Sequence, residues 1–369
     1  MTVFYYFSLS VIVIYITVQI LQLFSLIKYK SLKYKKFKDN ELPKISIWVA
    51  CRNEEKNIGA CLNALLALDY PKNLVQILVG DDQSTDKTRD IILAYCKNHP
   101  QIELVDIIED KKNLKAKARV MAQIDKKAVG DFYLITDADV EVKPSWAKGL
   151  LEFLSDDMGV ASGTTMVKCN TLDGKMQEID WAYFMGLLNA ISYNGVPATA
   201  VGNNMIVKRQ AYEETGGYGE IQFSITEDYK LYSEICAKGW GWNNIMHPDV
   251  LAYSKKTTGF KSLMHQRKRW LSGGKELPWY WWILFGIYAG FFFFIPVILV
   301  LKLKVGLTLW ALKFIIQTIQ IRSIYSHIDE KMPNLGTMII YEFYLFIVTV
   351  STAIFFVLPI KTNWKERKY

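Results

Sequence analysis

Several features that mark common protein classes are missing from the 369-residue sequence. Its five cysteines include no C-x-x-C pair, which argues against a zinc site and favours reduced thiols in a cytosolic compartment. No G-x-G-x-x-G follows the first β-rich apolar run at Ile45–Cys51, so a Rossmann dehydrogenase is not indicated. The sequence also has no internal repeat and no low-complexity segment.

Charged residues are scarce in four long apolar runs, which lie before and after a block of ordinary composition. The chain is 51% hydrophobic and 22% charged, which fits neither a disordered protein nor one made only of membrane helices. About 250 residues of ordinary composition, from Lys28 to Leu277, are long enough to bury a core of their own. Apolar runs of nearly the length that spans hydrocarbon lie around this block, at residues 4–27, 278–300, 305–320 and 338–360.

The net charge is +8, and six lysines lie directly after the first apolar run. A lysine cluster in this place is the positive-inside signal and attracts anionic headgroups, although a solvated linker is the alternative. We therefore expect an uncleaved membrane anchor at 1–27, a basic linker at 28–43, a cytoplasmic soluble block and no nucleic-acid partner. The inner or cell membrane is the expected location of this integral membrane protein. The lysines are Lys28, Lys30, Lys33, Lys35, Lys36 and Lys38.

A C-terminal membrane region of two or three spans is predicted at 278–360. The run at 305–320 contains Lys313, and the last run contains Glu342. An ionisable residue in such a run is either functional or placed near the headgroups. Four spans in total would put the basic tail at 361–369 outside, against the preference of lysine and arginine for the inside.

Strand-like and helix-like segments alternate in the first half of the soluble block, which predicts an α/β protein with a parallel sheet and helices on both faces. In such sheets ligands bind at the carboxyl ends of the strands. Asp81, Asp82, Asp137 and Asp139 fall at two of these ends. Strands are predicted at 45–51, 75–80, 102–107, 132–136, 160–167 and 199–208, and helices at 54–68, 84–95, 113–129, 177–193, 227–238 and 260–275.

Three short motifs carry residue types suited to chemistry, and each has a simpler interpretation. Asp137-Ala138-Asp139 can hold a hard divalent cation together with phosphate oxygens, or can be an ordinary turn. Thr226-Glu227-Asp228 precedes a predicted helix and provides either a catalytic carboxylate or only an N-cap. Gln266-x-x-Arg269-Trp270 lies in a basic amphipathic segment beside the membrane, where lipid binding is the alternative.

Together the motifs resemble membrane-bound family 2 glycosyltransferases. The order is Asp-Asp-Gln-Ser-Thr-Asp from residue 81, then Asp-Ala-Asp, Thr-Glu-Asp and Gln-Arg-Lys-Arg-Trp. Ceramide glucosyltransferases and the cellulose, hyaluronan, chitin and poly-N-acetylglucosamine synthases share the last motif. The resemblance implies a Rossmann-like GT-A domain at 44–258, an amphipathic interfacial helix at 259–277 and flanking transmembrane helices.

The resemblance also implies roles on the donor side. Asn53, Glu54, Asp81 and Asp82 would contact the nucleotide. Asp137 would bind the ribose or complete the metal shell, and Asp139 would ligate Mg²⁺ or Mn²⁺ on the pyrophosphate. Gln266 and Arg269 would hold the leaving diphosphate. Lys115 matches the donor-side lysine of the family, although Leu114 stands where a glycine usually precedes it.

On the acceptor side, Asp228 would be the general base, and Trp270 would form the floor of the site. Asn203 and Glu227 would contact the acceptor. Trp181, Tyr183 and Tyr193 either line the acceptor route or pack in the core.

The resulting hypothesis is inverting sugar transfer from a nucleotide sugar, expected to be a UDP-sugar, to a lipid or lipid-linked acceptor at the cytosolic membrane face. A small number of spans favours a lipid over a polymer. A processive polysaccharide synthase of the hyaluronan or poly-N-acetylglucosamine type is the alternative, and an inactive nucleotide-binding membrane scaffold is a third interpretation.

Overall fold

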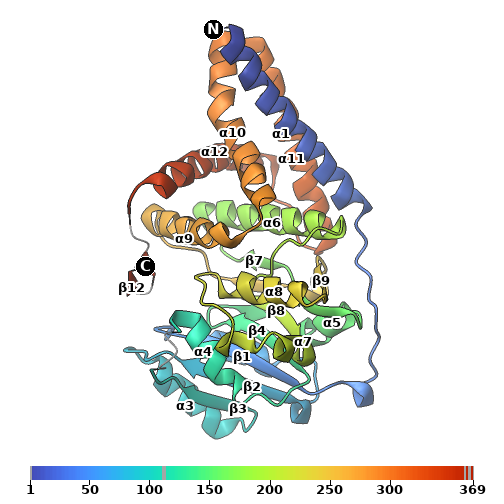
Figure 1. Ribbon diagram of the computed structural model, residues 1–369, viewed down its shortest axis with the longest axis vertical. Coiled ribbons are helices and arrows are strands. Elements are labelled where there is room, and N and C mark those ends of the chain that lie inside the picture. The colour runs from blue at the N-terminus through green and yellow to red at the C-terminus, as the bar shows by residue number, and fades with distance from the viewer. Residues whose placement is uncertain (1, 110–113, 361–362, 365–366, 369) are drawn as a thin grey trace. The chain divides into compact units, whose positions relative to one another are not determined.

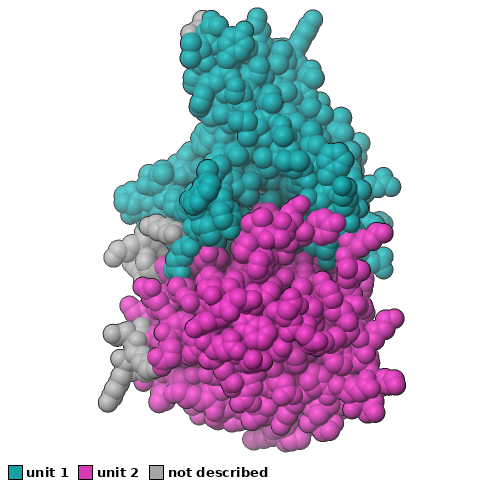
Figure 2. Space-filling model, turned by 45° about the vertical axis from the view of Figure 1, so that its right-hand side comes forward, with its two compact units in different colours: residues 1–29, 169–190, 256–369 teal, residues 30–168, 191–255 magenta. Residues whose placement is uncertain are grey.

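The computed structural model describes residues 2–109, 114–360, 363–364 and 367–368. Contacts group the chain into two units, which Figure 2 colours separately and which are described one at a time. Unit 1 comprises residues 1–29, 169–190 and 256–369, and unit 2 comprises residues 30–168 and 191–255. The segment 169–190, which lies inside the range 44–258 in the sequence, thus groups with the long apolar helices near the two ends of the chain. Most of the predicted basic tail at 361–369 lies outside the described residues.

Unit 2 is built on a seven-stranded sheet with the order β3-β2-β1-β4-β8-β6-β9 (Figure 1). The central strand β1 pairs in parallel with both β2 and β4, and β2 pairs in parallel with β3, as the alternating sequence pattern predicts. A three-stranded sheet, β5-β10-β7, completes the unit. The bounds are β1 Ile45–Cys51, β2 Val75–Asp81, β3 Ile102–Asp106, β4 Phe132–Asp137, β5 Glu141–Val142, β6 Met158–Ser162, β7 Thr165–Val167, β8 Asn204–Lys208, β9 Gly241–Asn244 and β10 Ala252–Ser254.

Strand β8, whose direction the sequence pattern does not predict, runs antiparallel to both β4 and β6. The chain re-enters the sheet from the end at which β4 stops, because Asn204 is the register partner of Thr136. Apolar patterning does not distinguish the two strand directions. The reversal places the two residues before β8 beside the carboxyl end of β4.

Helices cover both faces of this sheet, as predicted. Ile47 and Val49 of β1 share a buried core with Ile58 of helix α2. Trp48 points to the opposite face, where it stacks on Tyr133 and meets the ring of Tyr212 from helix α7. The helices of unit 2 are α2 Ile58–Leu66, α3 Thr88–Asn98, α4 Ala116–Asp125, α5 Trp146–Glu152, α7 Arg209–Glu214 and α8 Glu227–Ala237.

Two predicted strands are shorter than expected. The run predicted as one strand at 160–167 is broken into β6 and β7 at Gly163. A Cβ atom at Gly163 would lie 2.6 Å from the Val250 carbonyl oxygen and from Asn204 Oδ1, so a glycine is needed for this close approach. The strand predicted at 199–208 begins only at Asn204.

Part of the basic linker is bound to unit 2. Lys33 Nζ lies 2.8 Å from Glu152 and 2.7 Å from Asp249. Lys35 Nζ lies 2.5 Å from Asp156. These two of the six lysines therefore pair with protein carboxylates, while the interpretation of the whole cluster as a lipid-facing signal stays a prediction.

Unit 1 consists mainly of long helices. Among the described residues, three helices are long and apolar enough to span a membrane: α1, α10 and α12. The run predicted at 305–320 lies within α11, which carries Lys313 and is not among these candidates. The bounds are α1 Thr2–Lys28, α6 Leu172–Tyr193, α9 Phe260–Gly273, α10 Trp279–Leu301, α11 Leu303–His327 and α12 Leu335–Val357, and a small hairpin, β11 Asn363–Trp364 with β12 Arg367–Lys368, follows.

A buried ion pair joins α11 to α12. Lys313 Nζ lies 2.6 Å and 2.8 Å from the two carboxylate oxygens of Glu342, and Trp310 Nε1 donates to the same carboxylate at 3.1 Å. Lys313 has no exposed surface and Glu342 is 5% exposed. Glu342 is therefore charge-paired inside unit 1. Tyr183 is also buried there and donates to Gln19 of α1, which favours core packing for that tyrosine.

Candidate functional site

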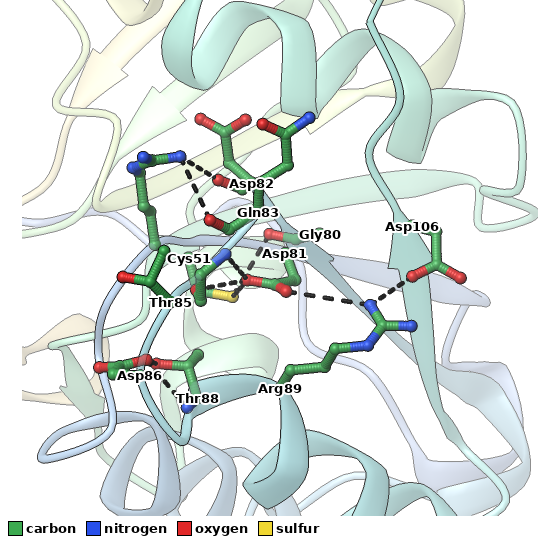
Figure 3. A network of polar contacts seen from close by, with 12 residues as sticks. Cys51, Gly80, Asp81, Asp82, Gln83, Thr85, Asp86, Thr88, Arg89 and Asp106 are labelled. Atoms are coloured by element: carbon green, nitrogen blue, oxygen red, sulfur yellow. Dashed lines mark hydrogen bonds and ion pairs between the residues drawn. The ribbon is translucent and has the colours of Figure 1, made fainter. Parts of the chain in front are cut away.

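The loops after β1 and β2 are fixed to each other by side chain to backbone hydrogen bonds. Figure 3 shows the part of this network around Asp81 and Asp82. Asn53 N donates to Ser84 Oγ at 3.0 Å, and Thr85 N donates to Asn53 Oδ1 at 2.8 Å. Ser84 Oγ in turn donates to Asp81 Oδ1 at 2.5 Å. Asn53 has a positive φ of 51°, a conformation that asparagine tolerates better than most residues. This hydrogen-bond network fixes the conformation of the two loops at the end of the sheet.

Asp81 and Glu54 contribute to the shape of these loops. Asp81 is buried. Arg89 Nη1 lies 3.9 Å from Asp81 Oδ2 and 2.5 Å from Asp106 Oδ1, so the guanidinium bridges the two carboxylates. The Glu54 backbone N–H donates to Thr88 Oγ1 at 2.7 Å, and its carboxylate accepts from Asn57 at 2.6 Å. Their predicted contacts with a nucleotide stay predictions, but both side chains lie where the strands end.

Asp82 lies between two arginines that the sequence motifs did not identify. Arg119 Nη2 of α4 lies 2.5 Å from Asp82 Oδ1. Arg52 Nη1 donates to the Asp82 carbonyl oxygen at 2.5 Å. Both arginines bring positive charge to a buried acidic position, which offsets the cost of burying that carboxylate.

Lys117 joins three separate segments of unit 2. Its Nζ lies 2.6 Å from Asp137 Oδ1 and 3.6 Å from Glu227 Oε1, and it donates to the Gly202 carbonyl oxygen at 3.0 Å. Burial lowers the pKa of Lys117, but the charges of Asp137 and Glu227 outweigh burial and raise it above its usual value. Lys117 is thus held as a cation at the carboxyl end of β4.

Lys115, the lysine chosen from the family pattern, is exposed at the N-cap of α4. It lies two residues before Lys117 in Lys-Ala-Lys-Ala-Arg. The repeated basic residue at 115, 117 and 119 was the only sequence signal for the two inward-facing side chains. The donor role of Lys115 stays a prediction.

Glu227 and Asp228 occupy the first turn of α8. Asp228 Oδ2 accepts from Gly202 N at 2.8 Å, and Asp228 Oδ1 accepts from Tyr229 N at 2.8 Å. A Cβ atom at Gly202 would lie 2.7 Å from the Cβ of Asp228, so only glycine permits this approach. In the described residues, the Thr226 side chain makes no capping hydrogen bond, so a plain N-cap does not explain the motif.

Glu227 is the carboxyl group of this cluster whose pKa is shifted. Its pKa is raised from 4.5 to about 7, mainly because the group is buried; the charge of Lys117 lowers the pKa, and the charge of Asp228 raises it. A carboxyl group whose pKa lies close to neutrality in a cluster of charges is typical of functional sites. Two neighbouring carboxyl groups of α8 therefore have different environments.

Asn203 lies next to Gly202, in the segment that leads into β8. Its side-chain oxygen accepts from Thr165 Oγ1 at 2.8 Å, and its carbonyl oxygen accepts from Thr136 Oγ1 at 3.0 Å. These bonds fix the segment beside the end of β4. An acceptor contact by Asn203 stays a prediction.

Asp137 and Asp139 offer oxygen ligands of the kind that Mg²⁺ and Mn²⁺ prefer. Burial raises the pKa of the Cys61 thiol, and the charges of Asp139 and Asp137 raise it further. Across the described ranges, no group of three or more His, Cys, Asp or Glu side chains is arranged to hold a metal. Two carboxylates completed by phosphate oxygens and waters fit such an ion, since Mg²⁺ sites commonly use this set.

Gln266, Arg269 and Trp270 lie on α9 in unit 1, away in the sequence from the acids of unit 2. The Arg267 guanidinium lies 4.5 Å from the centre of the Trp270 ring, and Trp181 meets the same ring edge-on at 5.4 Å. Within the part of the chain that the structure describes, Gln266 Oε1 is buried without a hydrogen-bond partner, as expected of an atom that contacts a ligand. Joint action of these residues with Asp228 stays a prediction.

Two family models match the chain. The glycosyl transferase family 2 model matches residues 46–216, and the glycosyl transferase family group 2 model matches residues 133–358.

Curated proteins with similar sequences include beta-monoglucosyldiacylglycerol synthase of Nostoc sp., 26% identical over 257 residues, which cover 68% of this chain and 53% of that protein. The Synechocystis sp. protein of the same name is 29% identical over 252 residues, or 65% of this chain and 50% of that one. Poly-beta-1,6-N-acetyl-D-glucosamine synthase of Staphylococcus aureus is 27% identical over 255 residues, or 68% and 59%. The chain spans about half the length of these relatives.

Among solved structures, a mannosyltransferase from Pyrobaculum calidifontis, in complex with GDP-Man and Mn²⁺, superposes with a TM-score of 0.59 at 16% identity. The match covers 96% of this chain and 99% of that one. At this identity the likeness concerns the fold, and it confirms the GT-A fold that the motifs predicted.

Proposed function

The chain belongs to glycosyl transferase family 2, and on that basis we propose that it transfers a sugar from a UDP-sugar to a lipid or lipid-linked acceptor, with inversion at the anomeric carbon. The observation that carries the proposal is the cluster in which Lys117 joins Asp137, Glu227 and the segment that fixes Asp228. Such a cluster would provide a fixed carboxylate base, Asp228, together with charged side chains that can contact a ligand. It lies at the carboxyl ends of the strands, where ligands bind in sheets of this class.

The donor would bind at the loops after β1 and β2. Asn53, Glu54, Asp81 and Asp82 lie there in a network of hydrogen bonds and an ion pair within the protein. A prearranged loop loses little freedom on binding, which favours affinity. We assign Gln266 and Arg269 to the leaving diphosphate, because a guanidinium suits phosphate geometry.

Asp139 and Asp137 would hold the divalent metal through their carboxylate oxygens. When bound, Mg²⁺ or Mn²⁺ supplies neutralisation of the charge that develops on the departing diphosphate. Lys117 supplies a further positive charge from the chain itself, directly beside Asp137.

Asp228 would accept the proton of the acceptor hydroxyl. Two backbone N–H groups fix the direction of its carboxylate, so the orientation needs no rearrangement during the reaction. Positioned general bases contribute roughly 100- to 10,000-fold to the rate. With one base and no protein nucleophile assigned, the transfer is a single displacement, which inverts the anomeric carbon.

The acceptor is proposed to be a lipid. Helices long enough to span a membrane belong to the same chain, and relatives named beta-monoglucosyldiacylglycerol synthases support a glycolipid product. The lysine cluster after α1 supports a cytoplasmic position for unit 2 in the inner or cell membrane. The poly-N-acetylglucosamine synthases among the relatives support the alternative of a polymer.

The test is incubation of membranes that contain the protein with a panel of radiolabelled UDP-sugars, followed by separation of lipid and polymer fractions. We expect one labelled sugar to enter the organic extract. Label in long, extract-resistant chains would support the processive alternative, and nucleotide binding without any transfer would support the scaffold.

A further inference from the structure

An acidic residue outside the family motifs contacts the motif helix of unit 1. Asp180 of α6 forms an ion pair with Arg267 Nη2 of α9, and both side chains are only 14% exposed. Tyr341 Oη of α12 also approaches the Asp180 carboxylate at 3.4 Å. The attraction within this largely buried pair is stronger than in a surface ion pair, because less water screens it.

The same arginine orients the aromatic residue of the motif. Arg267 lies over the Trp270 ring at 4.5 Å, within the range of a cation–π interaction. Trp181, the neighbour of Asp180 on α6, meets that ring edge-on at 5.4 Å. The Trp270 indole is thus fixed by two consecutive residues of α6, one through Arg267 and one directly.

A second contact sets the position of α9 along α6. Gln177 Nε2 donates to the Thr257 carbonyl oxygen at 2.9 Å, and Thr257 N donates to Gln177 Oε1 at 2.9 Å. Gln177 and Asp180 are three residues apart and therefore lie on one face of α6. One face of α6 therefore contacts α9 at two places: Gln177 binds Thr257, just before α9 begins, and Asp180 binds Arg267 within α9.

We propose that Asp180 is a positioning residue for the acceptor, which fixes Trp270 through Arg267, and that Trp181, only 8% exposed, supports the Trp270 ring from the side. This inference rests on the proposed function. An aromatic ring held in a fixed position suits the apolar face of a glycerol or sugar headgroup, and an acceptor lipid carries such a group close to the membrane surface.

The test measures transfer in membranes with Asp180→Asn, Arg267→Gln and the double variant, using the labelled UDP-sugar and a diacylglycerol or glycolipid acceptor series. Asp180→Asn should raise the KM for the acceptor by about tenfold and leave the KM for the donor within about twofold. The double variant should be no worse than Arg267→Gln alone, because Asp180 acts through that arginine. Asp180→Glu should restore most of the loss.

Asp173→Asn is the matched control, because Asp173 lies on the same helix and pairs with Lys256 at the surface. It should leave both KM values unchanged. Independent effects in the double variant, or an unchanged acceptor KM in Asp180→Asn, would overturn the inference.

Hydrogen exchange of the purified protein separates this inference from the proposed function, because it needs no activity. Asp180→Asn should speed exchange of the α9 amides severalfold relative to Asp173→Asn. Unchanged exchange refutes the positioning role even if transfer is observed. If Asp180→Asn exchanges faster but the unchanged protein transfers no sugar, the contact between Asp180 and α9 is supported. The proposed function, and with it the role in acceptor binding, is then refuted.

Discussion

At the scale of single residues, Lys117 determines how three acidic segments meet. Its ammonium group contacts Asp137, Glu227 and the Gly202 carbonyl, and Gly202 in turn binds Asp228. Without this cation, the negative charges of Asp137, Glu227 and Asp228 would lie close together without a countercharge, which is costly. A single side chain of α4 therefore permits the acidic cluster to exist.

Glu227 makes stability depend on pH. Burial raises its pKa from 4.5 to about 7, so between these values the native state keeps a proton that the unfolded state has released. The free energy of unfolding should therefore fall as pH rises through this window. Glu227→Gln should flatten that fall, measured as the melting temperature at about pH 5 and about pH 7.5. The exposed Glu213→Gln is the control, and an equal slope in both variants would contradict the pKa shift.

Asp139 tests the metal assignment. Asp139→Ala should weaken binding of the UDP-sugar in the presence of Mn²⁺, because one of two carboxylate ligands is lost. Isothermal titration of the purified protein, with and without Mn²⁺, measures the effect. Asp156→Asn, at an exposed surface carboxylate of unit 2, is the control. If Asp139→Ala binds the donor as tightly as the unchanged protein does, the assignment is wrong.

Residues within contiguous motifs were predictable, but the contacts between motifs were not. Asp228, Asp137 and Asn203 were identified from their neighbours in the sequence, and the structure places their segments around Lys117. Lys117 itself follows Lys115 by two positions, but Lys115 is the N-cap residue with an extended backbone, whereas Lys117 lies in the first turn of α4. The inward position of Lys117 therefore depends on where α4 begins, which spacing alone does not reveal.

At the scale of elements, the first four predicted strands match because apolar β-rich runs define them. β1 has the predicted bounds, and β2, β3 and β4 differ by one residue at an end. The direction of β8 was not predictable, because alternation of side chains is the same in parallel and antiparallel strands. That direction brings Gly202 and Asn203 to the end of β4, so the site depends on a feature without a sequence signal.

The contact between α11 and α12 gives a stability prediction. Lys313→Met would leave Glu342 buried without its cation and should cost about 3–5 kcal/mol. Lys313→Met combined with Glu342→Met should cost much less, because both charges are removed together. Thermal unfolding in detergent compares the variants. A single variant as stable as the double variant would contradict the buried ion pair.

At the scale of the whole molecule, composition predicted a soluble α/β part and a membrane part. It did not predict that residues 169–190 group with the candidate membrane-spanning helices, because α6 has the mixed composition of a soluble helix and its placement depends on tertiary contacts. The consequence is that unit 1 contains both the motif helix α9 and the helix that orients it.

The most direct measurement is the rate of labelled sugar transfer by Asp228→Asn in membranes, at saturating donor, beside the Asp156→Asn control. Loss of the general base should lower this rate by at least about 100-fold, while the affinity for the UDP-sugar and Mn²⁺ is retained. Turnover by Asp228→Asn close to that of the control would contradict a base at the start of α8, and with it the proposed transfer mechanism.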